Sequence, residues 1–95
     1  MKNEKKEPMG LGQKIRDMST KAQLEGRYIS VLDVRYNTAG IPVEVTDQYV
    51  FFAEAIEVLE TGKYGGKPVK WERVAPGGRL VMLSAVIRVD YIERE

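Results

Sequence analysis

The chain has 95 residues, 43% of them hydrophobic, which is enough for one small domain with a modest core. Its formal net charge of +1 excludes a global field that would draw it to nucleic acid or to a membrane surface, so an electrostatic function must come from local patches. The absence of cysteine and histidine excludes disulfides, thiolate nucleophiles, the usual zinc sites and the commonest general base. The apolar runs are too short for a membrane span and the first residues carry mixed charge, so we expect a cytoplasmic protein without a membrane contact.

Two segments precede the first expected strand. Residues 1–9 are mostly charged and have almost nothing to bury, so we expect a flexible N-terminal arm, which a neighbouring subunit could hold. Residues 10–95 are expected to form one small domain. From Leu11 to Glu25 apolar residues recur at helical spacing, and Gly26 stands where a C-terminal cap belongs. This pattern predicts a short amphipathic helix.

Alternation of apolar and polar residues predicts the next elements. Residues 27–36 alternate and indicate a first strand. Residues 37–40, Asn-Thr-Ala-Gly, supply turn residues, and Pro42 confines residues 41–46 to a short second strand at a strand start or a sheet edge.

Residues 47–62 form the longest apolar stretch and fit two structures. Read with the helical period, the stretch gives an amphipathic helix that Thr46 caps and Gly62 ends. Read as a strand, it is rich in the β-branched and aromatic residues that strands favour. The hairpin signals on both sides favour a long bent third strand. The alternative is an α+β fold with residues 47–61 as a helix packed on an antiparallel sheet.

The last third of the chain predicts a Gly-rich connection, a projecting hairpin over residues 62–79 and a closing strand over residues 86–92. The first and the closing strand each carry an aspartate and an arginine two residues apart. If they pair, Asp33 and Arg35 can meet Arg88 and Asp90 in a salt-bridge ladder that fixes the register. A magnesium site at Asp33 and Asp90 is the weaker alternative.

The order of these elements, a helix, a bent strand, a short hairpin, an apolar third strand, a long excursion and two closing strands, is similar to that of an Sm-like small β-barrel. Residues 83–92, Leu-Ser-Ala-Val-Ile-Arg-Val-Asp-Tyr-Ile, resemble the second Sm motif, and residues 47–51, Asp-Gln-Tyr-Val-Phe, resemble the start of the Asp-aromatic-Met-Asn loop. Phe51 stands where the family has asparagine, and Ser84 and Ala85 stand where it has the arginine and glycine that hold RNA. The resemblance implies an N-terminal helix and a five- to six-stranded small Sm or SH3-like barrel, without the family's RNA pocket.

A second likeness concerns residues 35–40, Arg-Tyr-Asn-Thr-Ala-Gly, and residues 50–55, Val-Phe-Phe-Ala-Glu-Ala, followed by Val58. These segments resemble those of small uncharacterised proteins of phages and mobile elements. The likeness covers about half of the chain and carries no known activity. It implies a β-barrel-like domain of viral or mobile-element origin, which would act in the cytoplasm of the host cell.

The best functional feature is a cluster of cations and aromatic rings that follows an acidic stretch. Residues 44–60 contain five acidic and no basic residues, whereas the next segment is basic with interleaved aromatic side chains. Such a combination lets rings stack on bases while cations contact phosphate. The alternative is that Trp71 covers one mouth of the barrel and the lysines keep the hairpin soluble. The candidate binding residues are Lys63, Tyr64, Lys67, Lys70, Trp71, Arg73 and Arg79.

We therefore expect a non-catalytic, homo-oligomeric binding protein of phage or mobile-element type that takes nucleic acid or a nucleotide, without a cofactor or a metal. An enzyme is not expected, because the serines and tyrosines have no histidine to activate them and no carboxylate pair is suitably spaced. The alternative is a protein-interaction module, an inhibitor of a host defence factor or a virion component. That module would use the apolar strand edges and the acidic face of Glu54, Glu57 and Glu60.

Overall fold

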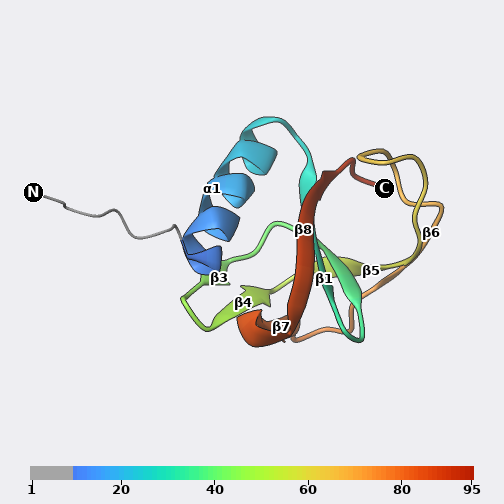
Figure 1. Ribbon diagram of the computed structural model, residues 1–95. Helices are drawn as coiled ribbons and strands as arrows, with labels where there is room; N and C mark the ends of the chain where they lie inside the picture. Colours follow the sequence, from blue (N-terminus) through green and yellow to red (C-terminus); the bar gives the residue numbers. More distant parts are fainter. Residues whose placement is uncertain (1–9) are drawn as a thin grey trace, which may run out of the picture.

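The computed structural model describes residues 10–95 (Figure 1), and the arm expected at residues 1–9 lies outside this range. Within it the fold is mainly β with one α-helix, as the sequence predicts, and it has eight strands and a short 3-10 helix. The elements are α1 (Leu11–Leu24), β1 (Tyr28–Asp33), β2 (Asn37–Gly40), β3 (Glu44–Val45), β4 (Tyr49–Phe52), β5 (Ala55–Glu60), β6 (Lys70–Arg73), β7 (Arg79–Met82), η1 (Leu83–Ala85) and β8 (Val86–Ile92).

Helix α1 matches the predicted amphipathic helix. Its face with Ile15 and Ala22 is buried, and Gly26 follows its end with φ at +71°, the left-handed conformation that ends helices. A Cβ built on Gly12 would lie 2.5 Å from the carbonyl oxygen of Thr46, so glycine lets the helix approach the β3–β4 turn. No helix within residues 10–95 is long and apolar enough to cross a membrane.

The strands form two antiparallel sheets. One has five strands in the order β6-β5-β2-β1-β8, and the other has three in the order β3-β4-β7. Over residues 10–95 the sheets are not closed into a barrel, because β6 and β8 end the first sheet and β3 and β7 end the second without pairing further. The expected closed barrel of five or six strands is corrected to two sheets with four edges.

Residues 47–61 form the predicted bent strand, in two parts. Tyr49–Phe52 (β4) pairs in the three-stranded sheet, and Ala55–Glu60 (β5) pairs in the five-stranded sheet. The bend falls at Ala53 and Glu54, which are both exposed. The alternative of a helix over residues 47–61 is wrong. The fold remains consistent with the α+β class of that alternative, because α1 packs against the five-stranded antiparallel sheet.

The turn expected at residues 37–40 is wrong. These residues form β2, whose Thr38 and Ala39 are fully buried between β1 and β5. The chain reverses earlier, where the carboxylate of Asp33 accepts hydrogen bonds from the amides of Arg35 (2.8 Å) and Tyr36 (2.7 Å). An aspartate that binds the backbone two and three residues ahead makes a turn without glycine. The small residues of β2 serve instead for close packing, since a Cβ on Gly40 would meet Glu54 O at 3.0 Å.

The segment expected to project as a hairpin, residues 62–79, pairs with the body of the protein. Strand β6 pairs with β5, and β7 pairs with β4. Between them the chain crosses from one sheet to the other beside the bend of β4–β5, and the amide of Val74 donates to Ala55 O at 2.9 Å. Gly78, with φ at +83°, makes the crossing, and its Cβ would lie 2.1 Å from Phe52 O. Only glycine fits there, because a Cβ would clash with Phe52 O and because other residues rarely take a positive φ.

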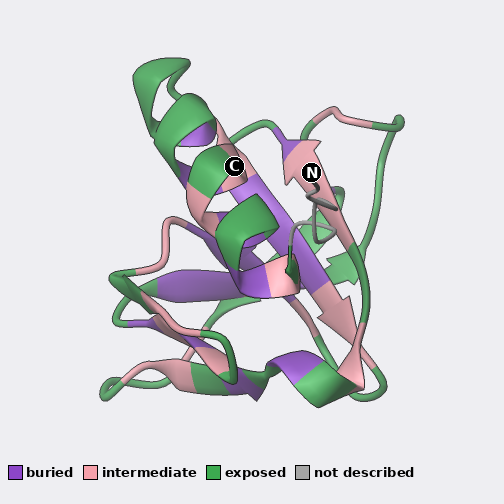
Figure 2. Ribbon diagram, turned by 60° about the vertical axis from the view of Figure 1, so that its left-hand side comes forward, coloured by how far each residue is buried: buried purple, intermediate pink, exposed green. Residues whose placement is uncertain are grey.

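Apolar side chains pack on both faces of the five-stranded sheet. Figure 2 shows buried stretches along its central strands. The main core lies between the two sheets and α1 and includes Phe52, Ile29 and Val31, all fully buried. A smaller cluster lies on the opposite face, where Ala39 of β2 stands beside Ile56 of β5. We call this second face the outer face.

Candidate ligand-binding site

The Gly-rich connection between β5 and β6, residues 61–69, is a compact loop that we call the β5–β6 loop. Its ends meet, because the amide of Val69 donates to Glu60 O at 2.8 Å, and inside it the amide of Gly66 donates to Lys63 O at 2.8 Å. Pro68 is buried, and Gly65 takes φ at +74°. These contacts hold the loop in a compact shape.

The β5–β6 loop lies beside the end of β8 and the C-terminal residues (Figure 1). The amide of Glu93 donates to Gly66 O at 3.3 Å, and the hydroxyl of Tyr64 lies 3.4 Å from Oδ1 of Asp90. Ser30 of β1 lies opposite both Ala39 of β2 and Asp90 of β8. Directly opposed residues share a face of the sheet, so Ser30 and Asp90 lie on the outer face.

A pocket of about 270 Å³ lies between the loop and the outer face, and we call it the loop pocket. The loop contributes residues 61–66 as one wall. Four polar side chains from three strands line the other wall: Ser30, Asn37, Arg88 and Asp90.

These four side chains are held in two pairs. The hydroxyl of Ser30 donates to Oδ1 of Asn37 at 2.5 Å. Nε of Arg88 lies 2.7 Å from Oδ2 of Asp90. The wall of the loop pocket therefore presents hydrogen-bond donors and acceptors that neighbouring residues already orient.

This pairing corrects the expected salt-bridge ladder. Strands β1 and β8 do pair, but Arg88 lies opposite Leu32 and turns to Asp90 on its own strand. Asp33 holds the turn that follows β1. Asp33 and Asp90 therefore have separate roles, and in residues 10–95 no group of three metal-ligating residues is brought together.

Lys63 and Tyr64 are the predicted binding residues that line the loop pocket. Both are exposed, and Tyr64 is 90% exposed, which is unusual for an aromatic residue and leaves its ring free for a ligand. Lys67 belongs to the same loop but lines a separate hollow beside Gly26.

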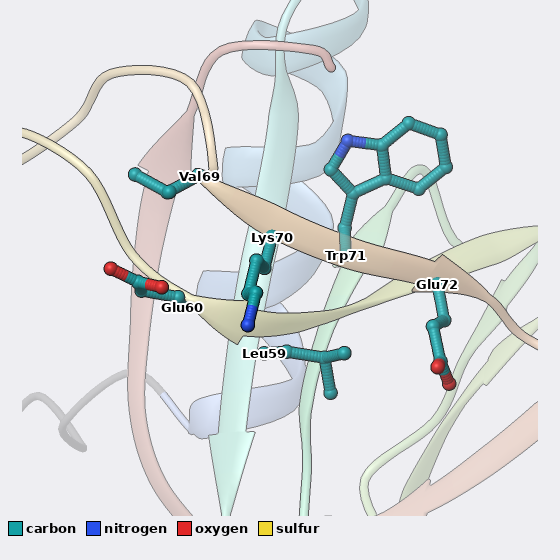
Figure 3. A pocket seen from close by; sticks show the side chains of 6 residues that line it. All are labelled: Leu59, Glu60, Val69, Lys70, Trp71 and Glu72. Atoms are coloured by element: carbon teal, nitrogen blue, oxygen red, sulfur yellow. The ribbon is translucent and has the colours of Figure 1, made fainter.

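Lys70 and Trp71 lie elsewhere, on β6, where they line a shallow depression together with Leu59 and Val69. In Figure 3 the side chain of Trp71 lies on one side of β6, and those of Lys70 and Glu72 lie on the other side. Trp71 is 37% exposed, and its ring lies 5.4 Å from the guanidinium of Arg73. The structure thus separates the tryptophan from the lysine that precedes it.

Arg73 and Arg79 already have partners. Arg73 lies 3.4 Å from the carboxylate of Glu95. Arg79 donates to Thr38 and Glu57, both at 3.1 Å, and is mostly buried. The site proposed below therefore does not use these two arginines.

The separation of charge along the sequence is partly cancelled in space. Strand β5, which carries Glu57 and Glu60, pairs with β6, and Glu60 lies opposite Lys70. Glu57 forms an ion pair with Arg79 of β7. Lys63 and Lys67 belong to the β5–β6 loop, and Arg88, which is paired with Asp90, lines the loop pocket. Sequence reasoning missed Ser30 and Asn37 as site residues, because they enter only through the pairing of β1, β2 and β8.

Comparison of the chain with family models, with curated proteins and with solved structures finds no match.

Proposed function

We propose that the protein is a non-catalytic binding protein that takes nucleic acid or a nucleotide at the β5–β6 loop. One observation carries the proposal: the ring of Tyr64 is 90% exposed at a pocket that also holds Lys63 and Arg88. An exposed aromatic residue provides stacking for a base, and Lys63 provides attraction for a phosphate, whereas Arg88 is paired with Asp90 and offers hydrogen-bond donors.

The shape and the polar wall of the loop pocket support the same class of ligand. A volume of about 270 Å³ is just below the usual range of pockets for drug-sized molecules, so it fits one base better than a longer ligand. The pairs Ser30–Asn37 and Arg88–Asp90 offer directed hydrogen bonds of the kind that base edges need.

The test is a binding titration with single-stranded oligonucleotides and with mononucleotides, on wild type, Tyr64→Ala and Trp71→Ala. Loss of a stacked ring costs about 1–3 kcal/mol per base, so we expect Tyr64→Ala to weaken binding by about tenfold or more. Trp71→Ala is the matched control for an aromatic ring outside the loop pocket, and we expect it to have a much smaller effect.

Repeating the titration at several salt concentrations separates phosphate contacts from other contacts. Lys63→Ala removes the cation of the loop pocket. Lys14 lies exposed on α1 and does not line that pocket, so Lys14→Ala is the control for the loss of a surface cation. Absence of binding to every oligonucleotide and nucleotide would remove the proposal. Equal losses for Tyr64→Ala and Trp71→Ala would move the site from the pocket to the wider surface of the loop and β6.

The Sm-like resemblance and the phage or mobile-element origin form a broader proposal. The order of a helix, bent strands and closing strands supports the Sm-like part, since β4–β5 and β6–β7 each run through both sheets. The phage or mobile-element part rests on the sequence likeness of residues 35–40 and 50–55 alone. Under this proposal the four sheet edges would be available to further copies of the chain, as in a homo-oligomer. Light scattering in solution gives the subunit count that tests it.

A second candidate is the protein-interaction module, an anti-defence inhibitor or a virion component. The observation that favours it is the solvent-facing side of the three-stranded sheet, where Leu80 pairs with Phe51 and Met82 with Tyr49. Leu80 is 51% and Met82 48% exposed, so over residues 10–95 this face presents uncovered apolar side chains beside the exposed Glu44 of β3. The partner would be a folded protein with an apolar surface.

Leu80→Asp tests this second candidate. We expect it to abolish complex formation with such a partner and to leave nucleotide binding at the loop pocket unchanged. A wild-type chain that captures no protein, while Leu80→Asp behaves identically, would count against it. A dimer that Leu80→Asp dissociates would identify the partner as a second copy.

A further inference from the structure

We propose that the loop pocket selects guanine among the bases. The inference rests on the proposed function, because it specifies which ligand the pocket takes. It is carried by the pair Arg88–Asp90, which places a donor and an acceptor side by side on the pocket wall.

The pair leaves hydrogen-bonding capacity on both sides. It joins Nε of Arg88 to Oδ2 of Asp90 at 2.7 Å, so the two Nη groups of the guanidinium are left for a ligand among the described residues. Over residues 10–95, Oδ1 of Asp90 accepts one hydrogen bond, a long one of 3.4 Å from the hydroxyl of Tyr64. A carboxylate accepts several hydrogen bonds, so Oδ1 retains free acceptor positions.

Guanine matches this arrangement along one edge. Its O6 accepts hydrogen bonds, and the adjacent N1–H and N2–H groups donate them, so O6 can face the arginine while both donors face the carboxylate. Adenine has a donor where guanine has O6, which would oppose the arginine. Uracil offers an acceptor and one donor, but its next group is a second acceptor, which would oppose Asp90. Cytosine has a single amino donor and two acceptors.

The remaining groups suit the rest of a guanine nucleotide. The ring of Tyr64 can stack on the large face of a purine, which gives more contact than a pyrimidine does. Lys63 lines the same pocket and provides a cation for the phosphate. Arg88 is 61% exposed, so its guanidinium can adjust to the ligand.

The experiment is a titration of wild type with GMP, AMP, UMP and CMP, followed by NMR spectra in which the amides of Gly65 and Gly66 report on the loop. We expect GMP to bind about five- to 150-fold more tightly than the other three, because one well-made bidentate contact discriminates by about 1–3 kcal/mol. The same titration is made on Asp90→Asn, with Glu93→Gln as the control for a neighbouring exposed carboxylate.

Asp90→Asn is expected to make the affinities for GMP and AMP equal, so that the preference is lost, and Glu93→Gln is expected to preserve the preference. If Asp90→Asn does not fold, as seen by circular dichroism, Arg88→Gln provides the second test, with the same loss of preference expected. Equal binding of all four nucleotides overturns the guanine inference and leaves the proposed function standing. Absence of binding to all nucleotides and oligonucleotides overturns both.

Discussion

Nη2 of Arg79 lies 3.1 Å from Oε1 of Glu57, and this ion pair joins β7 of the three-stranded sheet to β5 of the five-stranded sheet. Nη1 of the same guanidinium donates to Oγ1 of the buried Thr38 at 3.1 Å. The ring of Tyr36 lies against the guanidinium, 4.0 Å from its carbon to the ring centroid. One side chain thus contacts both sheets and the turn between β1 and β2.

Arg79→Ala should therefore destabilise the fold more than a surface substitution does. The side chains of Arg79 and Glu57 are only 19% and 25% exposed, and removal of the arginine leaves a partly buried carboxylate and a buried hydroxyl without their donor. We expect the free energy of unfolding to fall by roughly 2–3 kcal/mol, measured by urea denaturation. Arg35→Ala, at an exposed turn position, is the control and should change it by less than about 0.5 kcal/mol. Equal losses for Arg79→Ala and Arg35→Ala would show that the contacts of Arg79 with Glu57 and Thr38 do not stabilise the fold.

The glycines at the crossing between β6 and β7 give a matched pair of substitutions. Both take positive φ, +101° at Gly77 and +83° at Gly78, but a Cβ on Gly77 meets nothing within 4 Å. A Cβ on Gly78 would lie 2.1 Å from Phe52 O. We expect Gly77→Ala to cost about 1 kcal/mol for backbone strain alone, and Gly78→Ala to cost several times more. Thermal denaturation of the two variants measures the difference, and similar melting temperatures would contradict the crossing described above.

Stability at alkaline pH should depend on Tyr28. Burial, then a hydrogen bond and the negative charge of Glu95, raise the pKa of Tyr28 above its ordinary value of 10.0. The folded state favours the neutral phenol, so its contribution to stability is complete below about pH 10 and is lost as the pH rises through the higher folded-state pKa. We expect Tyr28→Phe to lose stability less steeply than wild type above about pH 10. The exposed Tyr64→Phe is the control, and parallel curves for wild type and Tyr28→Phe would contradict the assignment.

Binding of single-stranded oligonucleotides should become less dependent on salt when Lys63 is replaced. Each phosphate contact on a single strand contributes about 0.7 to the slope of the logarithm of affinity against the logarithm of salt concentration. We expect Lys63→Ala to reduce the slope by about that amount, because the lysine lines the loop pocket. An unchanged slope would mean that Lys63 makes no phosphate contact. The guanidinium of Arg73 is already paired with the carboxylate of Glu95, so Arg73→Ala should leave the slope unchanged.

The sequence predicts the elements whose signals are local. The helical period and Gly26 give α1 to within one residue, and alternation gives β8 at Val86–Ile92. The turn at residues 37–40 was predicted from composition, and it failed because the side chain of Asp33 reverses the chain three residues earlier. Small residues mark both turns and tightly packed strands, and only the neighbouring strands distinguish the two.

Partners that are far apart in sequence could not be predicted. The hairpin signal at Gly77 and Gly78 is real as a turn signal, but β6 and β7 bind β5 and β4 because the bend of the third strand divides it between two sheets. The same limitation applies to the candidate site. Lys63 and Tyr64 could be selected by their charge and aromatic character, whereas Ser30 and Asn37 reach the pocket only through strand pairing.

The crossing of β4–β5 and β6–β7 from one sheet to the other also determines how the molecule opens. The chain passes directly from β4 to β5 and from β6 to β7, so opening one sheet displaces strands of the other. The hydrogen bond from Val74 to Ala55 joins the two crossings. The two sheets should therefore form one cooperative unit in native-state hydrogen exchange, with their slowest amide protons reporting the same opening free energy. The β5–β6 loop, whose bonds to β8 and the residues after it are long, 3.3 Å at Glu93 and 3.4 Å at Asp90, would exchange through smaller openings while both sheets stay closed.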